Sequence, residues 1–242
     1  MKIDYAIMGS NLNPMYLDFW PIISKVWKKV FNITPVLGLI CEEDSEFFED
    51  ENGIVKKFKR IEGIDSGLQS QIIRLFLTKE LKGNIIISDI DMVPLSKEYF
   101  IEQIKFFDEN KIYVMSSDNA ECNQNKEIPM CYNVSNSELF SKMLEINEDW
   151  VNFTHRLKNM GFGWTTDQNY LWLKMQKFSQ ENPENVVLLS RGWGLGANGR
   201  IDRISWKYDE SLVRSGKYID SHLLRPYKEN KLEVDKLINL LW

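Results

Sequence analysis

The chain has 242 residues, of which 43% are hydrophobic and 27% are charged, and its formal net charge is −5. A chain of this length can bury a sizeable core within one α/β domain. Its acidic balance argues against a general nucleic-acid-binding protein, which normally carries a surplus of Lys and Arg to neutralise phosphates. No apolar run approaches the roughly 20 residues that span a bilayer, so we expect a soluble protein without a transmembrane segment.

The N-terminus and the cysteines bear on the cellular compartment. The first residues include Asp4 and are typical of a strand, without the cleavage pattern of a secretory signal. The three cysteines, Cys41, Cys122 and Cys131, are an odd number without Cys-x-x-Cys spacing, so they indicate neither a disulfide framework nor a zinc site. We therefore expect a cytoplasmic or cytosol-facing protein with reduced cysteines.

The opening of the chain has the pattern of a β-α-β unit. Residues 3–8 are apolar enough for a buried strand, and Gly9-Ser10-Asn11 predicts a loop after it. Apolar residues recur at helical spacing over residues 19–30, with Pro21 in the first turn, and residues 34–40 predict a second strand. This order favours a parallel sheet.

A second helix leads into a strand that ends in two acids. An apolar stripe predicts a helix over residues 66–81, with Gly83 as its C-cap glycine. Residues 84–88 then predict a short, fully apolar strand that runs into Asp89-Ile90-Asp91 and stops by Pro94. Ligands bind at the carboxyl ends of strands in open α/β sheets, so these acids are well placed to bind one.

The second half of the chain mixes element types, and its C-terminus repeats apolar residues at i, i+3, i+4 and i+7, as in an amphipathic helix. The predicted elements are a helix at 98–107, a strand at 112–115, a loop at 116–127, a strand at 130–134, helices at 137–146, 150–160 and 167–177, a strand at 186–189, a glycine-rich loop at 191–199 and the C-terminal helix at about 228–242. That last helix either packs on its own domain, which we favour, or contacts a partner or a membrane surface peripherally.

Asp89 and Asp91 suit a hard divalent cation. Mg²⁺ and Mn²⁺ prefer oxygen ligands and usually share their coordination sphere with substrate phosphates. Charged residues are seldom placed against a buried parallel strand unless they are used. His222, in a polar segment near the end of the chain, is the predicted third ligand, whereas His155 lies in a helical pattern that indicates a solvated face.

Further polar side chains are candidates for contacts with an anionic ligand. Arg74 departs from the apolar stripe of its helix, so it either reaches a diphosphate or is a solvated surface arginine. Arg225 follows His222 and would place a fixed positive charge near the phosphates. Ser10 and Asn11 follow the first strand and are candidates for contacts with a base or ribose.

Asp167 and Trp193 are candidates for the reaction itself and for the acceptor. Asp167 opens a predicted helix, which would explain it as an N-cap. It is also a candidate catalytic carboxylate, because an inverting sugar transfer needs a base to take the proton of the attacking hydroxyl. Trp164, Trp193 and Trp206 lie near polar loops and suit stacking on a sugar ring, and we select Trp193 for acceptor binding.

Taken in chain order, these features resemble the GT-A fold of nucleotide-sugar glycosyltransferases with an Asp-x-Asp motif. The resemblance covers nearly the whole chain. It is carried by Gly9-Ser10-Asn11, the helix with Arg74, the strand at 85–88 with Asp89-Ile90-Asp91, Asp167-Gln168-Asn169 and His222. It implies a single α/β domain with a mixed, mainly parallel central sheet flanked by helices, with a nucleotide-binding half at about 1–95 and an acceptor-side half at about 96–227.

The resemblance also implies the roles of these residues. Asp91 would bind Mn²⁺ or Mg²⁺ directly, Asp89 would divide between metal and ribose, His222 would complete the metal site, and Asp167 would face the acceptor or sugar. The nucleotide-sugar would be bound by six residues, namely Gly9, Ser10, Asn11, Arg74, Ser88 and Arg225. The expected activity is transfer of a hexose from a nucleotide-diphosphate sugar, with UDP-sugar favoured, to a hydroxyl of a glycan, protein or lipid-linked acceptor.

Two departures and two alternatives stay open. Asn169 replaces the last acid of the Asp-Gln-Asp found in retaining relatives, and His222 lacks the following Gly-x-x-Lys-Pro-Trp, so the sequence does not decide the stereochemistry. A haloacid-dehalogenase-like phosphatase also has Asp-x-Asp after a strand, although Met92-Val93 is atypical of one. The other alternative is a carbohydrate-binding module that keeps the fold without turnover.

Overall fold

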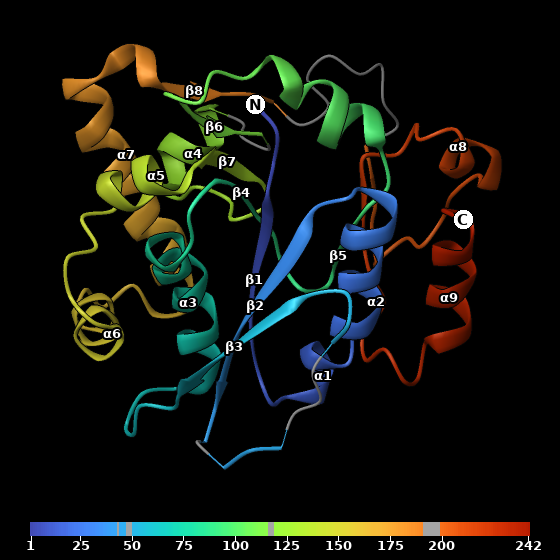
Figure 1. Cartoon of the computed structure of the whole chain (residues 1–242), viewed down its shortest axis with the longest axis horizontal. Coiled ribbons are helices and arrows are strands. Elements are labelled where there is room, and N and C mark those ends of the chain that lie inside the picture. The colour runs from blue at the N-terminus through green and yellow to red at the C-terminus, as the bar shows by residue number, and fades with distance from the viewer. Residues whose placement is uncertain (43, 47–49, 116–118, 191–198) are drawn as a thin grey trace.

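The computed structural model describes the chain apart from residues 43, 47–49, 116–118 and 191–198. A central sheet lies between two layers of helices (Figure 1). One layer contains α2 (Trp20–Lys25) and α9 (Lys231–Asn239), and the other contains α3 (Ser66–Glu80), α5 (Ser137–Met143), α6 (Trp150–Lys158) and α7 (Thr166–Glu181). No helix in the described part of the chain has the length and apolar character to cross a membrane.

The central sheet has seven strands in the order β3-β2-β1-β4-β7-β6-β8. Its strands are β1 (Tyr5–Asn11), β2 (Thr34–Cys41), β3 (Ile54–Lys59), β4 (Asn84–Ile87), β6 (Ile112–Val114), β7 (Asn133–Asn136) and β8 (Val186–Leu188). All neighbours pair in parallel except β7, which is antiparallel to both β4 and β6. The carboxyl ends of β1, β2 and β4 therefore meet at one edge, as expected for a mainly parallel sheet.

A second, three-stranded sheet joins distant parts of the chain. It contains β5 (Met92–Pro94), β10 (Asp220–His222) and β9 (Arg200–Ile201) in that order. β10 is antiparallel to β5, with His222 opposite Met92, and the amide of Leu223 donates to the carbonyl of Asp91 over 2.9 Å. This pairing brings the C-terminal segment alongside the Asp-x-Asp motif.

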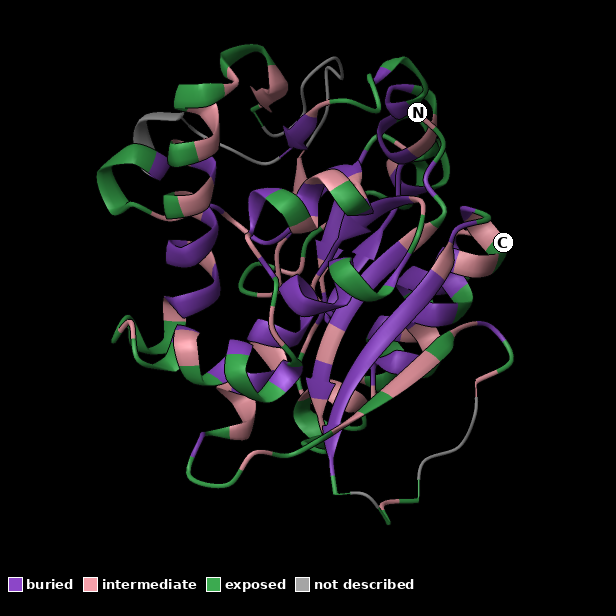
Figure 2. Cartoon of the chain, turned by 60° about the vertical axis from the view of Figure 1, so that its left-hand side comes forward, coloured by how far each residue is buried: buried purple, intermediate pink, exposed green. Residues whose placement is uncertain are grey.

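The core consists of two apolar clusters, one on each face of the central sheet, whose inner strands are mostly buried in Figure 2, unlike the edge strand β3. α3 packs closely on β1, because a Cβ built on Gly9 would lie 2.1 Å from the carbonyl oxygen of Ser70. α3 begins after Asp65, whose side chain accepts from the amide of Leu68 over 3.0 Å. The glycine at position 9 thus serves the packing of a helix on a strand.

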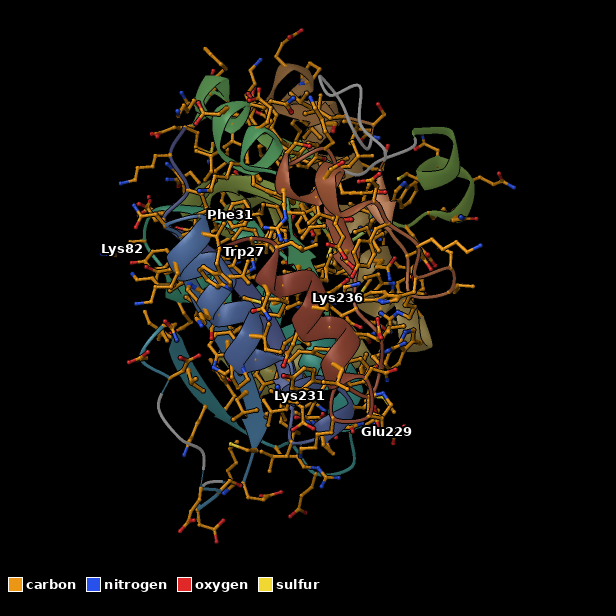
Figure 3. All side chains as sticks on the ribbon, turned by 90° about the vertical axis from the view of Figure 1, so that its right-hand side faces the viewer. Trp27, Phe31, Lys82, Glu229, Lys231 and Lys236 are labelled. Atoms are coloured by element: carbon orange, nitrogen blue, oxygen red, sulfur yellow. The ribbon has the colours of Figure 1, made fainter. Side chains whose placement is uncertain are left out.

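The C-terminal helix packs on its own domain. Val234, Leu237 and Ile238 of α9 are buried in the same cluster as Trp27 and Phe31. Lys231 and Lys236 lie on the exposed part of this helix, seen in Figure 3, and pair with acids of the same chain. This is the arrangement that the amphipathic pattern favours.

Several predicted boundaries were wrong. Gly9-Ser10-Asn11 belongs to β1, because β2 continues beside it and pairs with all three residues. Gly83 does not cap α3, which ends at Glu80. The loop predicted at 116–127 contains a helix, α4 (Asn119–Asn125). The strands β3, β5, β9 and β10 and the helix α8 (Glu210–Arg214) were not predicted. The remaining short elements are α1 (Pro14–Leu17), π-helices η1 (Val26–Val30) and η2 (Glu98–Glu102), and 3₁₀ turns η3 (Ile104–Phe106), η4 (Gly163–Thr165) and η5 (Pro183–Asn185).

Candidate active site

A cavity of about 1000 Å³ opens at the carboxyl ends of β1, β2 and β4. Eight of the predicted functional residues line it, namely Gly9, Ser10, Asn11, Arg74, Asp89, Asp91, His222 and Arg225. Small-molecule pockets usually measure about 300–1,000 Å³, so this cavity is at the upper end of the range for ligand sites. It is the place where the structure brings most of the predicted residues together.

Asp91 and His222 lie side by side although they are far apart in sequence. The pairing of β10 with β5 places the imidazole Nε2 of His222 3.5 Å from Oδ2 of Asp91. Asp91 is 5% exposed, and burial, followed by the charge of Asp89, raises the pKa of its carboxyl above the ordinary value. A carboxylate in such a position is stabilised by any cation that reaches it.

The second motif acid, Asp89, is held by Arg74 and Cys131. Arg74 Nη1 forms a short ion pair with Oδ1 of Asp89, and Cys131 Sγ lies 3.0 Å from Oδ2. Burial alone would raise the pKa of Asp89, but the charge of Arg74 and these hydrogen bonds outweigh it and lower that pKa. Asp89 is therefore a charged, oriented carboxylate at the cavity.

Two further arginines reach Asp91. Nη2 of Arg203 lies 2.7 Å from Oδ2 of Asp91, and Nη1 of Arg225 lies 3.6 Å from the same oxygen. Arg225 also donates to the hydroxyl of Tyr16 over 2.7 Å, with its guanidinium 5.0 Å from the centre of that ring. Tyr16 thus fixes Arg225 at the rim of the cavity.

Asp167 lies behind Arg74 and not on the cavity wall. It is 0% exposed, and its Oδ2 accepts from Nη2 of Arg74 over 2.6 Å. α7 begins at Thr166, so Asp167 lies in its first turn, and its Oδ1 accepts from the amide of Gln168 over 2.9 Å. The N-cap explanation was therefore wrong by two positions, since Thr165 is the N-cap. The observed contacts make Asp167 a partner of Arg74.

The carboxyl end of β1 is held by its own polar side chains. Asn11 Nδ2 donates to Ser66 Oγ over 2.9 Å, and Asn11 Oδ1 accepts from the amide of Asn13 over 3.1 Å. Ser10 Oγ donates to the carbonyl of Asn11 over 3.0 Å. These bonds shape the cavity wall near β1 and α3.

Two more of the predicted residues, besides Asp167, were not found on the cavity wall that the structure describes. Ser88 is fully buried and donates to the carbonyl of Asp89 over 3.2 Å, so it supports the backbone of the motif. Trp193 lies outside the described residues. Residues at the cavity that the sequence did not single out include Tyr16, Cys131 and Arg200. No local pattern identifies them, because their neighbours come from distant segments.

The side chains at this site supply some, but not all, of the ligands that a divalent cation needs. In the part of the chain that the structure describes, no group of three or more His, Cys, Asp or Glu side chains surrounds a single point. Asp91 and His222 supply one oxygen and one nitrogen at the cavity. Mg²⁺-type sites commonly use one or two carboxylates plus substrate phosphates and water. Asp91 and His222 therefore fit as the protein's share of a site that a diphosphate completes.

Comparison with known proteins identifies the fold. No protein-family model and no curated protein matches the sequence. The galactosyltransferase LgtC, solved with donor and acceptor sugar analogues, is similar with a TM-score of 0.51 and 11% identity over 100% of this chain and 95% of that chain. A glycosyltransferase involved in glycosylation of the major capsid of PBCV-1 has a TM-score of 0.52 and 9% identity over 98% and 99%. The chain has the GT-A fold of glycosyltransferases, with a mainly parallel sheet flanked by helices in one domain.

Proposed function

We propose that the protein is a metal-dependent glycosyltransferase that transfers a hexose from a nucleotide-diphosphate sugar, UDP-sugar being favoured, to a hydroxyl of a glycan, protein or lipid-linked acceptor. The observation that carries this proposal is the pairing of Asp91 with His222 at a cavity that Arg74 and Arg225 also line. A site with adjacent carboxylate, imidazole and guanidinium groups suits a cation and a diphosphate together.

Different residues of the cavity would bind different parts of the donor. Asp91 and His222 would hold Mn²⁺ or Mg²⁺, and the bound ion would offset the charge that develops on the departing diphosphate. Arg225, seated on Tyr16, is within reach of Asp91 and would donate to phosphate oxygens. Ser10 and Asn11 would contact the nucleoside, since they lie on the cavity wall at the carboxyl end of β1.

Asp167 would act through Arg74. Its carboxylate is fully buried against Nη2 of Arg74, while Nη1 of the same guanidinium holds Asp89. Arg74 is thereby fixed between two acids with little freedom to rotate, and its guanidinium would present a fixed charge to the donor. These contacts support a positioning role for Asp167, and its role as the catalytic base stays a prediction from the sequence.

The alternatives are separated by the fold and by turnover of a nucleotide-sugar. A haloacid-dehalogenase-like phosphatase is disfavoured because the chain has the fold of glycosyltransferases. A carbohydrate-binding module on the same fold would bind sugars without turnover of a nucleotide-sugar. Hydrolysis or transfer of a nucleotide-sugar that depends on Mn²⁺ would distinguish an enzyme from such a module.

Calorimetric titration of UDP, GDP, ADP and CDP, each with and without Mn²⁺, tests the proposal. We expect one nucleoside diphosphate to bind preferentially, with Mn²⁺ raising its affinity at least about tenfold, which corresponds to about 1.4 kcal/mol. Asp91→Asn should lose the effect of Mn²⁺ while it keeps the fold by circular dichroism. Equal, metal-independent binding of all four nucleotides would sink the proposal.

A further inference from the structure

The turn before α7 presents two aromatic side chains to solvent. Gly161 and Gly163 have φ angles of +77° and +64°, a backbone region that favours glycine. Between and after them, Phe162 is 39% exposed and Trp164 is 61% exposed. A Cβ on either glycine would meet no atom within 4 Å, so the backbone conformation and not crowding calls for glycine there.

Hydrogen bonds hold this turn in place. Thr166 Oγ1 donates to the carbonyl of Gly163 over 2.7 Å, and Thr165 Oγ1 lies 2.7 Å from Oδ1 of Asn169. Lys158, at the end of α6, donates to the carbonyl of Gly63 in the loop before α3 over 3.2 Å. Trp164 is thus an exposed ring on an anchored turn, so little conformational entropy is lost when a ligand contacts it.

The exposed ring lies at the cavity and not on a remote surface. Trp164 lines the cavity, as does Gln168 one helical turn later. On its other side the ring packs beside the first turn of α3, since a Cβ built on Gly67 would lie 3.4 Å from Cζ3 of Trp164. In the described part of the structure no hydrogen bond or aromatic pair involves the indole. Its face is available to a ligand.

We infer that Trp164 is the platform on which the acceptor binds, through stacking of the apolar C–H face of a pyranose ring on the indole. This inference rests on the proposed transferase function and names the acceptor class, a glycan or glycoside. An aromatic ring with a polar edge suits a sugar, whose faces are apolar and whose rim carries hydroxyls. The nearby amide of Gln168 supplies donors and acceptors for those hydroxyls.

The position of Trp164 favours an acceptor sugar over the nucleobase. Asn11 and Cys41, the last residues of β1 and β2, also line the cavity, and nucleotides bind at such strand ends in α/β folds. Trp164 instead precedes the helix whose first turn reaches Arg74 through Asp167. Trp164 lines the same cavity as Asp91 and His222, so an acceptor on its ring would share that cavity with the donor.

Saturation-transfer difference NMR with methyl glycosides of glucose, galactose, mannose and N-acetylglucosamine, in the presence of UDP and Mn²⁺, tests the inference. We expect at least one glycoside to receive saturation mainly on the protons of one ring face. Trp164→Ala should weaken its affinity about tenfold, and Trp164→Phe should retain most of it, because the phenyl ring still stacks. Phe106→Ala, which removes an 89% exposed ring elsewhere, is the matched control.

Three results would overturn the inference: no glycoside bound, equal glycoside affinity in Trp164→Ala and wild type, or a loss in Trp164→Ala that is larger for UDP than for the glycoside. The last result would make the ring a nucleobase platform. If wild-type protein does not bind UDP, the proposed transferase function fails, and glycoside binding measured without UDP then decides whether Trp164 is still a glycan platform.

Discussion

Nη2 of Arg203 lies 2.7 Å from Oδ2 of Asp91, the same oxygen that lies 3.5 Å from Nε2 of His222. The Arg203 side chain is 14% exposed, and its Nε and Nη1 are buried without a hydrogen-bond partner in the described part of the chain. A protein cation therefore sits on the carboxylate oxygen that a divalent ion would share with His222. Binding of the ion at this oxygen requires Arg203 to withdraw or to share the carboxylate.

Removal of Arg203 should strengthen Mn²⁺ binding in the absence of nucleotide. A charge-assisted hydrogen bond contributes about 1.5–3 kcal/mol, so Arg203→Met should tighten Mn²⁺ binding about tenfold. The free Mn²⁺ signal in electron paramagnetic resonance measures this affinity directly. Arg214→Met, at an exposed arginine of α8, is the control and should change nothing. Weaker Mn²⁺ binding by Arg203→Met would show that Arg203 orients Asp91 instead of competing with the ion.

The buried pair of Asp167 with Arg74 should matter for stability. Breaking a buried ion pair by removing one partner costs about 3–5 kcal/mol, because it leaves a charge uncompensated. Arg74 keeps Asp89 as a second partner, so we expect Asp167→Asn to lower the free energy of unfolding by about 3 kcal/mol. Urea unfolding measures this loss.

A double-mutant cycle with Arg74→Met separates the pair from other effects of Asp167. Coupling of at least about 1 kcal/mol between the two substitutions would support the positioning role. If the stability losses of the two substitutions add without coupling, and Asp167→Asn lowers kcat without changing KM, Asp167 acts on the substrate and not through Arg74.

The first half of the site could be predicted from the sequence because local patterns carry it. The apolar run before Asp89 predicts a buried strand, and the β-α-β order upstream places its carboxyl end beside that of β1. β3 was missed because its six residues carry three lysines and much of it is exposed at the edge of the sheet. The loop predicted at 9–11 was wrong because pairing with β2 keeps these residues in the extended conformation of a strand.

The second half of the site depends on contacts between distant segments, which a sequence pattern does not record. β10 is only three residues long and forms because β5 and β9 pair with it. Arg203 meets Asp91 across a separation of 112 residues. Nothing in the local sequence of either residue indicates its partner, so this ion pair could not be predicted. The same holds for the contact of Arg225 with Tyr16.

Gly9 should be intolerant of even a methyl group. Its Cβ would lie 2.1 Å from the Ser70 carbonyl and 2.7 Å from Cγ2 of Ile73, so α3 must shift away from β1. Overpacking of this kind costs about 1–3 kcal/mol, and backbone contact puts Gly9→Ala at the upper end. Thermal unfolding measures the loss. Gly63→Ala, with φ of +72° and open space, should cost only about 1 kcal/mol of backbone strain. Equal losses for the two variants would contradict the close approach.

Glu145 should make stability depend on acid pH. Its side chain accepts hydrogen bonds from Lys174 and, over 2.6 Å, from Lys177, and these bonds, that of Lys174 first, lower the pKa of Glu145 to about 2. A carboxyl with a lowered folded pKa stabilises the protein at pH values above its unfolded pKa of about 4.3 and loses that contribution as pH falls toward 2.

The ion pairs of Glu145 are substantially exposed, with 40% of its side chain accessible. Screening by solvent therefore limits their contribution to the free energy of unfolding to less than about 1 kcal/mol. We expect Glu145→Gln to be less stable than wild type at pH 6 and the two proteins to converge as pH approaches 2. Urea midpoints measured at pH 6, 4 and 2.5 follow this difference, with Glu138→Gln, at an exposed acid of α5, as the control. A difference that stays constant with pH would mean that the substitution acts through packing, because only the ionised carboxylate attracts the two lysines.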